Sequence, residues 1–96
     1  MSRYQLPALP QFAGHDIAIG WDRVGTFFAY VFDRDADGED VVIVNIGDRP
    51  GEITNPQDAI QHVRPYAAIP ADARDLAAAL HADARHEGSI SATHRT

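Results

Sequence analysis

Three stretches of the chain carry apolar residues in patterns that are typical of β-strands. Residues 15–21 alternate large and small apolar side chains with the period of two that a strand requires. Residues 26–33 are rich in aromatic and β-branched side chains, and residues 41–46 are mainly Val and Ile. The segments 22–25 and 34–40 contain Asp and Gly and are typical of turns. The pattern therefore predicts a three-stranded antiparallel meander.

Two later stretches carry helical signals. Asn55 and Pro56 predict a helix start, with Asn as the N-cap and Pro at the first helical position. Ile60 and Val63 lie three residues apart and share one face of this helix. Pro65 ends or kinks it, because proline lacks the backbone N–H that a helix interior needs.

A second, alanine-rich helix is predicted to open at Pro70 and to end at Gly88. Its apolar stripe at helical spacing consists of Ala73, Leu76, Ala77, Leu80 and Ala84. The predicted fold class is therefore α+β, a three-stranded antiparallel meander followed by two helices packed on one face. We expect an extended N-terminal arm over residues 1–14, a single domain over 15–88 and a disordered polar tail over 89–96.

The side chains on each face of the sheet depend on the register of the two hairpins. We pair Trp21 with Thr26 in the first hairpin and Asp33 with Val41 in the second. The face that this register turns toward the helices consists of Ile17, Ile19, Trp21, Phe28, Tyr30, Phe32, Val42, Val44 and Ile46. The opposite face consists of Ala18, Gly20, Phe27, Ala29, Val31, Val41, Ile43 and Asn45. Both faces are mainly apolar, whereas a sheet with one solvated face alternates apolar and polar residues.

The second face should therefore be covered. The N-terminal arm is one candidate, because it carries the apolar side chains Tyr4, Leu6, Leu9 and Phe12. A protein partner or a second copy of the chain is the other, because exposed apolar patches usually mark interfaces. Phe27, Val31 and Ile43 would then form the interface. Both explanations remain open at the level of sequence.

The composition narrows the functional classes. The 96 residues have a hydrophobic content of 45 %, a formal net charge of −6 and no cysteine. The lack of cysteine removes thiolate chemistry and favours a reducing, cytoplasmic environment. No apolar run approaches the length of a membrane span. The acidic balance argues against direct binding of nucleic acid or of an anionic membrane surface, and it leaves a basic protein partner.

Candidate catalytic chemistry is sparse. Residues 33–38 resemble the opening of a calcium loop, but Val44 stands where an EF-hand needs a bidentate Glu. His81 and His86 lie five residues apart, on different faces of the predicted helix, whereas metal pairs on a helix prefer three or four. The serines lie in the two termini, where nothing holds a base in line. We therefore expect no enzymatic activity, no metal site and no cofactor.

The acidic segment between the second and third strands offers a different kind of surface. Its carboxylates, which a hairpin tip would present together, are Asp33, Asp35, Asp37, Glu39 and Asp40. Such a tip can dock on basic residues of a partner. It can equally be a solvated loop whose charges keep the sheet edge from pairing with other chains.

Three short runs carry a resemblance. Residues 20–22, 26–29 and 31–33 read Gly-Trp-Asp, Thr-Phe-Phe-Ala and Val-Phe-Asp. In these runs the chain resembles an uncharacterised family of small bacterial proteins. Residues 50–53 and 64–66 fit the same resemblance. It implies a compact bacterial domain and supplies no activity, substrate or site residue.

The leading hypothesis is a small, non-enzymatic protein-interaction module that acts through the acidic tip, the second sheet face or both. One version is a phage- or plasmid-type inhibitor whose acids imitate nucleic-acid phosphates against a basic target. A first alternative is a small-ligand or metal-binding regulatory domain with its site near Trp21, Tyr30 and His62. A second alternative is a structural homodimer subunit built on the face of Phe27, Val31 and Ile43.

Overall fold

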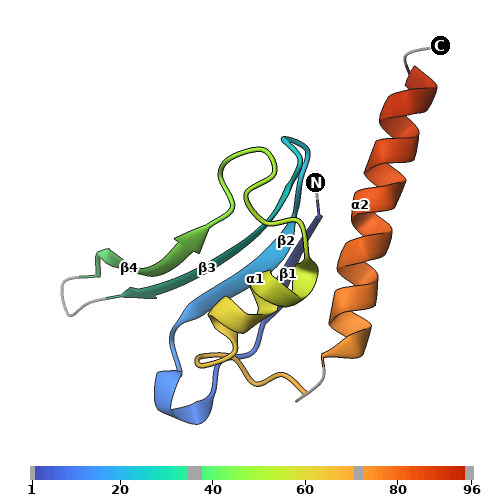
Figure 1. Cartoon of the computed structure of the whole chain (residues 1–96). Helices are drawn as coiled ribbons and strands as arrows, with labels where there is room; N and C mark the ends of the chain where they lie inside the picture. The colour runs from blue at the N-terminus through green and yellow to red at the C-terminus, as the bar shows by residue number, and fades with distance from the viewer. Residues whose placement is uncertain (1, 35–37, 71–72, 95–96) are drawn as a thin grey trace.

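The computed structural model describes residues 2–34, 38–70 and 73–94 of the chain. Its elements are β1 (Ser2–Leu6), a 3-10 turn (Pro10–Phe12), β2 (Asp16–Asp22), β3 (Thr26–Arg34), β4 (Asp40–Ile46), α1 (Pro56–Val63) and α2 (Arg74–His94). The strands form one antiparallel sheet in the order β1-β2-β3-β4 (Figure 1). The α+β class and the meander of β2, β3 and β4 are confirmed. The sheet also has a fourth strand that the sequence pattern did not predict.

The fourth strand is the N-terminal arm. β1 pairs with β2 along its length, from Ser2 opposite Trp21 to Leu6 opposite Ile17. Tyr4 and Leu6 pack against the core. The arm therefore extends the sheet at its edge and does not lie across the second face, which was one of the two open explanations.

The hairpin between β2 and β3 closes with Asp22 opposite Thr26, so its loop contains only residues 23–25. The Gly25 N–H donates to the Asp22 carbonyl oxygen at 3.0 Å, and Gly25 has a φ of +103°. A three-residue hairpin loop ends in such a left-handed residue, which glycine adopts without steric cost. The predicted pairing of Trp21 with Thr26 is therefore wrong by one residue.

The hairpin between β3 and β4 contains the predicted pair Asp33–Val41, next to its closing pair Arg34–Asp40. A β-bulge further along makes Ile43 the extra residue and moves Val44 to a position opposite Val31. A bulge of this kind changes which side chains share a face, because one strand gains a residue over its partner. The second half of β4 is thus shifted relative to the predicted register.

The register of the first hairpin overturns the predicted assignment of β3 to the sheet faces. Phe27 and Val31, which were expected on the second face, are 2 % and 0 % exposed and lie in the core under the helices. Phe28, Tyr30 and Phe32, which were expected under the helices, lie on the opposite face. The reason is that a shift of one residue turns every side chain of a strand to the other side.

Both helices pack on the face that contains Phe27. The buried cluster on this side consists of Ile17, Ile19, Phe27, Ala29, Val31, Ile53, Ala59, Ile60, Val63, Ala67, Ala73, Ala77 and Leu80. β2 therefore presents its predicted residues to the helices, while β3 presents the alternate set. Figure 1 shows α1 in front of the strands and α2 beside it.

The helix α1 begins as predicted. The Asn55 side chain accepts a hydrogen bond from the Gln57 N–H at 2.9 Å, and Pro56 occupies the first turn. Ile60 and Val63 are both fully buried. The N-cap and the apolar pair therefore fix where α1 starts and which face it turns to the sheet.

The helix α2 departs from the prediction at both ends. It begins at Arg74 rather than at Pro70, and it continues through Gly88 to His94. The predicted end at Gly88 is therefore wrong. Near the middle of α2, the Asp83 carboxylate accepts a hydrogen bond from the Tyr4 hydroxyl at 2.5 Å, which ties α2 to β1.

Candidate functional site

The candidate site is the sheet face opposite α1 and α2, which we call the open face. Within the described residues, both helices pack on the other side of the sheet, and the open face carries a row of large side chains from β3. Its principal residues are Arg3 of β1, Ala18 and Gly20 of β2, Phe28, Tyr30 and Phe32 of β3, and Val42 and Asn45 of β4. The sequence analysis placed Ala18, Gly20 and Asn45 on this face correctly, whereas the residues that it expected there from β3 lie on the other side.

Three of the four aromatic residues of β3 form a row on the open face, namely Phe28, Tyr30 and Phe32. The rings of Tyr30 and Phe32 are stacked, with centroids 4.7 Å apart and an interplanar angle of 19°. The Phe28 ring leans over β2, where a Cβ atom on Gly20 would lie 2.7 Å from Phe28 Cζ. Glycine at this position therefore lets the ring lie down on the sheet, and the outer side of the row remains half-exposed.

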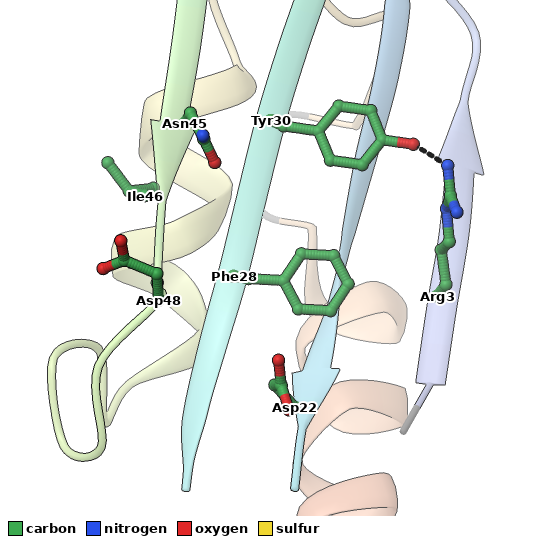
Figure 2. Close-up of a pocket in the computed structure, with 8 residues that line it drawn as sticks. Arg3, Asp22, Phe28, Tyr30, Asn45, Ile46 and Asp48 are labelled. Carbon is green, nitrogen blue, oxygen red and sulfur yellow. Dashed lines mark hydrogen bonds between the residues drawn. The ribbon is translucent and has the colours of Figure 1, made fainter. Parts of the chain in front are cut away.

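Arg3 closes the row on the β1 side. Its guanidinium carbon lies 5.2 Å from the centroid of the Tyr30 ring, and the guanidinium also donates a hydrogen bond to the Tyr30 hydroxyl. Figure 2 shows the Arg3 side chain rising from β1 to meet the end of Tyr30. The first contact is a cation–π interaction, which shows that a ring of this row accepts a guanidinium group.

A pocket of about 330 Å³ lies on the open face across β3. Its lining residues are Arg3, Asp22, Phe28, Tyr30, Asn45, Ile46, Gly47 and Asp48. Figure 2 shows Asp22 beside the Phe28 end of the row, Asp48 on the β4 side and Arg3 at the far end of Tyr30. The pocket thus has an aromatic floor, with the Asp22 carboxylate near Phe28 and the Arg3 guanidinium near Tyr30, while the Asp48 carboxylate points away from Phe28 on the outer side of β4.

The β4 wall of this pocket is held in place by Glu52. Its carboxylate accepts hydrogen bonds from the backbone N–H groups of Gly47 and Asp48, each at 3.1 Å. The hydrogen bond from Gly47 is the main reason that the pKa of Glu52 lies below its ordinary value. Gly47 has a φ of +91°, and a Cβ atom there would lie 2.2 Å from the Phe27 carbonyl oxygen. This corner of the pocket therefore requires glycine and has a defined backbone.

The predicted acidic tip is only partly described. Asp33 lies at the end of β3, with its Oδ1 3.5 Å from His15 Nδ1, and Glu39 is exposed. Asp35 and Asp37 lie outside the described residues, as does the side chain of Asp40. A shared acidic surface at this tip therefore stays a prediction.

The three residues of the predicted apolar interface do not lie on one surface of the folded chain. Phe27 and Val31 are core residues and are not available to a partner in this fold. Ile43 is 37 % exposed at the β-bulge, and its neighbours Val41 and Val42 are 44 % and 59 % exposed. Of the three predicted interface residues, only Ile43 lies on the surface, next to a pair of exposed valines.

Sequence reasoning missed Arg3, Phe28 and Asp48 as site residues. It named Tyr30 only for an alternative site between the sheet and the helices, with Trp21 and His62, whereas the register places Tyr30 on the open face. Arg3 was hidden because residues 1–14 were interpreted as an arm, although Tyr4 and Leu6 alternate with Arg3 and Gln5 as in a strand. Phe28 and Tyr30 were assigned to the core by the register error. The position of Gly25 was the signal that could have corrected that error.

The described residues contain no group of three or more His, Asp or Glu side chains placed to hold a metal ion. Among the described helices, none is both long and apolar enough to cross a membrane. Comparison with known protein families, curated proteins and solved structures finds no match to this chain. The functional argument therefore depends on the open face itself.

Proposed function

We propose that this protein is a small, non-enzymatic interaction module that docks on a basic protein partner with its open face. The observation that supports the proposal is the row of Phe28, Tyr30 and Phe32 on a sheet face away from both helices. Aromatic and arginine side chains are enriched among the residues that dominate binding energy at protein interfaces. The open face supplies both kinds of side chain on a sheet whose other face is already used for the core.

The charge of the chain indicates the kind of partner. The formal net charge is −6, and both Asp22 and Asp48 line the pocket on the open face. An acidic surface attracts basic partners during encounter and repels acidic ones. If the basic surface of the partner normally binds nucleic acid, this module would inhibit the partner by occupying that surface. The proposal therefore includes the inhibitor described in the sequence analysis.

Direct binding of single-stranded nucleic acid is the principal competitor, because aromatic rings on a sheet face can also stack bases. Such sites combine stacking with a basic groove that follows the phosphate backbone. Here Arg3 is accompanied on the open face by Asp16, Asp22 and Asp48, within a chain of net charge −6. The electrostatics therefore favour a cationic partner over a polyanion.

Two adjacent valines provide a matched test. Val42 lies opposite Phe32 on the open face, whereas Val41 lies opposite Asp33 on the other face, and both are well exposed. We would capture partners from a lysate of the native host with the wild-type chain, Phe32→Ser, Val42→Ser and Val41→Ser. The proposal expects a partner with a basic surface whose capture weakens in Phe32→Ser and Val42→Ser and persists in Val41→Ser. It also expects weaker capture at high salt.

Equal capture by all four proteins would contradict docking on the open face. A partner that is acidic, or nucleic acid that elutes without protein, would contradict the proposed chemistry. Each variant must first show the wild-type melting temperature, so that loss of capture reports the surface and not the fold.

A specific observation also supports the homodimer alternative. In the described part of the chain β4 pairs only with β3, and Val41, Val42 and Ile43 of this edge strand are exposed. An exposed apolar edge strand can pair with the same strand of a second copy. Light scattering at high concentration tests this candidate, which predicts a dimer that Val42→Lys converts to a monomer. A wild-type chain that is strictly monomeric would remove it.

A further inference from the structure

We infer that the open face receives one amphipathic α-helix of the basic partner, which lies along β3, an inference that rests on the proposed function. The helix would place apolar side chains on the row of Phe28, Tyr30 and Phe32 and cations near the two ends of β2. The shape of the apolar strip on this face and the positions of its charges support a single helix as the occupant.

The backbone groups of the two central strands are used within the sheet. β2 pairs with β1 and β3, and β3 pairs with β2 and β4. A segment that lies on the side chains of these strands must therefore satisfy its own backbone groups, because unpaired groups against apolar rings cost free energy. An α-helix satisfies them internally, whereas a single extended segment on top of the sheet does not.

The apolar strip on the open face is about two strands wide. The Phe28 ring lies against Gly20, and Ala18, opposite Tyr30, is fully buried, so the rings of β3 cover β2 (Figure 2). Exposed polar side chains border the strip, namely Arg3 and Gln5 on β1 and Asn45 on β4. Two strands span about 10 Å, which is the diameter of one helix, whereas a second sheet would need a wider apolar surface.

The length of the aromatic row matches the spacing of side chains along a helix. From Phe28 to Phe32 the strand advances by about 13 Å. Side chains at positions i, i+4 and i+8 of a helix share one face and span about 12 Å. A helix that runs along β3 can therefore place one apolar side chain on each ring. The pocket of about 330 Å³ beside Phe28 and Tyr30 gives one of them a hollow to enter.

Carboxylates of β2 lie near both ends of the row. Asp16 is exposed opposite Phe32, and Asp22 lies beside Phe28 in Figure 2. The strand advances by about 20 Å from Asp16 to Asp22. Each carboxylate attracts a cation of its own, so the two need not meet at one group of the ligand. A helix whose cations are separated by about 13 residues is complementary to this arrangement.

The charge of the chain disfavours a second copy as the occupant. A second copy would bring a formal net charge of −6 to a face that already carries Asp16 and Asp22, and like charges oppose such an encounter. Arg3 places one positive charge on this face and leaves the carboxylates in the majority. A basic helix of a different protein is therefore the occupant that the face fits.

The probe is a blocked peptide, Ac-Arg-Arg-Ala-Leu-Ala-Gln-Ala-Leu-Ala-Gln-Ala-Leu-Ala-Arg-Arg-NH₂, whose leucines share one helix face between two pairs of arginines. It is titrated calorimetrically into the full chain at low ionic strength. One control peptide has proline in place of the second glutamine, which breaks the helix and keeps every leucine and arginine. A second control has glutamate in place of each arginine.

We expect submillimolar affinity for the arginine peptide, affinity weaker by about tenfold for the proline peptide, and no detectable binding of the glutamate peptide. Equal affinity for the arginine and proline peptides would show that the face does not select a helix and would overturn the inference. No binding of the arginine peptide would overturn it as well.

Variants of the apolar strip then locate the peptide. Phe32→Ser should weaken the arginine peptide by about tenfold, because one ring of the row is lost. Val42→Ser, opposite Phe32, should also weaken it and decides the question if Phe32→Ser melts early. The matched control Val41→Ser lies on the other face and should bind as the wild type does. Equal weakening in Val41→Ser and Val42→Ser would contradict binding on the open face.

Charge variants test the two ends of β2. Asp16→Asn and Asp22→Asn should each weaken the arginine peptide by about threefold, as expected for an exposed ion pair. Asp58→Asn removes the same charge from the exposed side of α1 and should have no effect. Equal loss in all three variants would mean non-specific attraction and contradict the inferred position of the helix.

The outcomes separate this inference from the proposed function. If the arginine peptide does not bind but capture of a basic partner still depends on Phe32 and Val42, the inferred helix is wrong and open-face docking stands. If the peptide binds as described but capture is the same in Phe32→Ser and wild type, the helix site stands and the proposed docking face for the captured partner is wrong.

Discussion

The neighbouring residues Phe27 and Phe28 offer a direct test of the sheet register. Phe27 is 2 % exposed and contacts the Trp21 ring edge-on, with centroids 4.9 Å apart. Phe28 is half-exposed on the open face. Replacing a fully buried phenylalanine with alanine costs about 3–5 kcal/mol, because apolar contacts are lost and a cavity remains. We expect that cost for Phe27→Ala and only about 1 kcal/mol for Phe28→Ala.

These magnitudes are large relative to the stability of a small domain. A chain of this size has a free energy of unfolding of about 5–15 kcal/mol, so Phe27→Ala should remove a large part of it. Each kcal/mol lowers the melting temperature of a domain this small by roughly 4–8 °C. The two variants should therefore melt at least roughly 8 °C apart, with Phe27→Ala the lower.

Urea unfolding followed by circular dichroism measures both variants against the wild type. The slope of unfolding free energy against urea should be unchanged, so that the midpoint alone reports stability. Equal losses, or a larger loss for Phe28→Ala, would refute the register, because Phe28 would then be the buried residue. That result would restore the sheet faces that the sequence pattern predicted.

Three further perturbations test individual contacts. Tyr4→Phe removes the hydrogen bond to Asp83 and should destabilise the fold by on the order of 1 kcal/mol. That hydrogen bond is the main reason that the pKa of Tyr4 lies above 10.0. Its contribution to the stability of the wild type should therefore be complete below pH 10 and disappear as pH rises through the folded pKa, whereas Tyr4→Phe should show no such pH dependence. Because the pKa of Glu52 is lowered in the folded state, its carboxylate stabilises the wild type above the ordinary Glu pKa of 4.5, and this stabilisation disappears as pH falls through the lowered folded pKa. Glu52→Gln should lack this stabilisation, and melting curves recorded at acidic pH would show the difference. Gly47→Ala should unfold at markedly lower urea than Gly51→Ala, because both glycines have positive φ but only Gly47 meets the Phe27 carbonyl.

Local signals in the sequence were sufficient for the helices and for the presence of strands. Asn55 and Pro56 predicted the start of α1 correctly, because capping depends on residues adjacent in sequence. Leu80 and Ala77 were correctly placed on the buried stripe of α2. Asp33 opposite Val41 was also predicted correctly, since that pair lies next to the acidic turn.

The assignment of side chains to the two faces of the sheet was harder to predict from the sequence, because it depends on how many residues each connection contains. The loop after Asp22 contains three residues and not four, which reversed β3. The bulge at Ile43 has no sequence signature as clear as the glycine of a turn, and it shifted the second half of β4. The aromatic row therefore appeared in the predicted core.

The location of the partner on the chain tests the central claim most directly. We would record ¹H–¹⁵N correlation spectra of the labelled chain while adding the captured basic partner. Docking on the open face predicts that the largest amide changes fall on β3 and on residues 45–48, with the exposed side of α1 unaffected. Changes confined to α1 and α2, or to the acidic tip around Glu39, would contradict it.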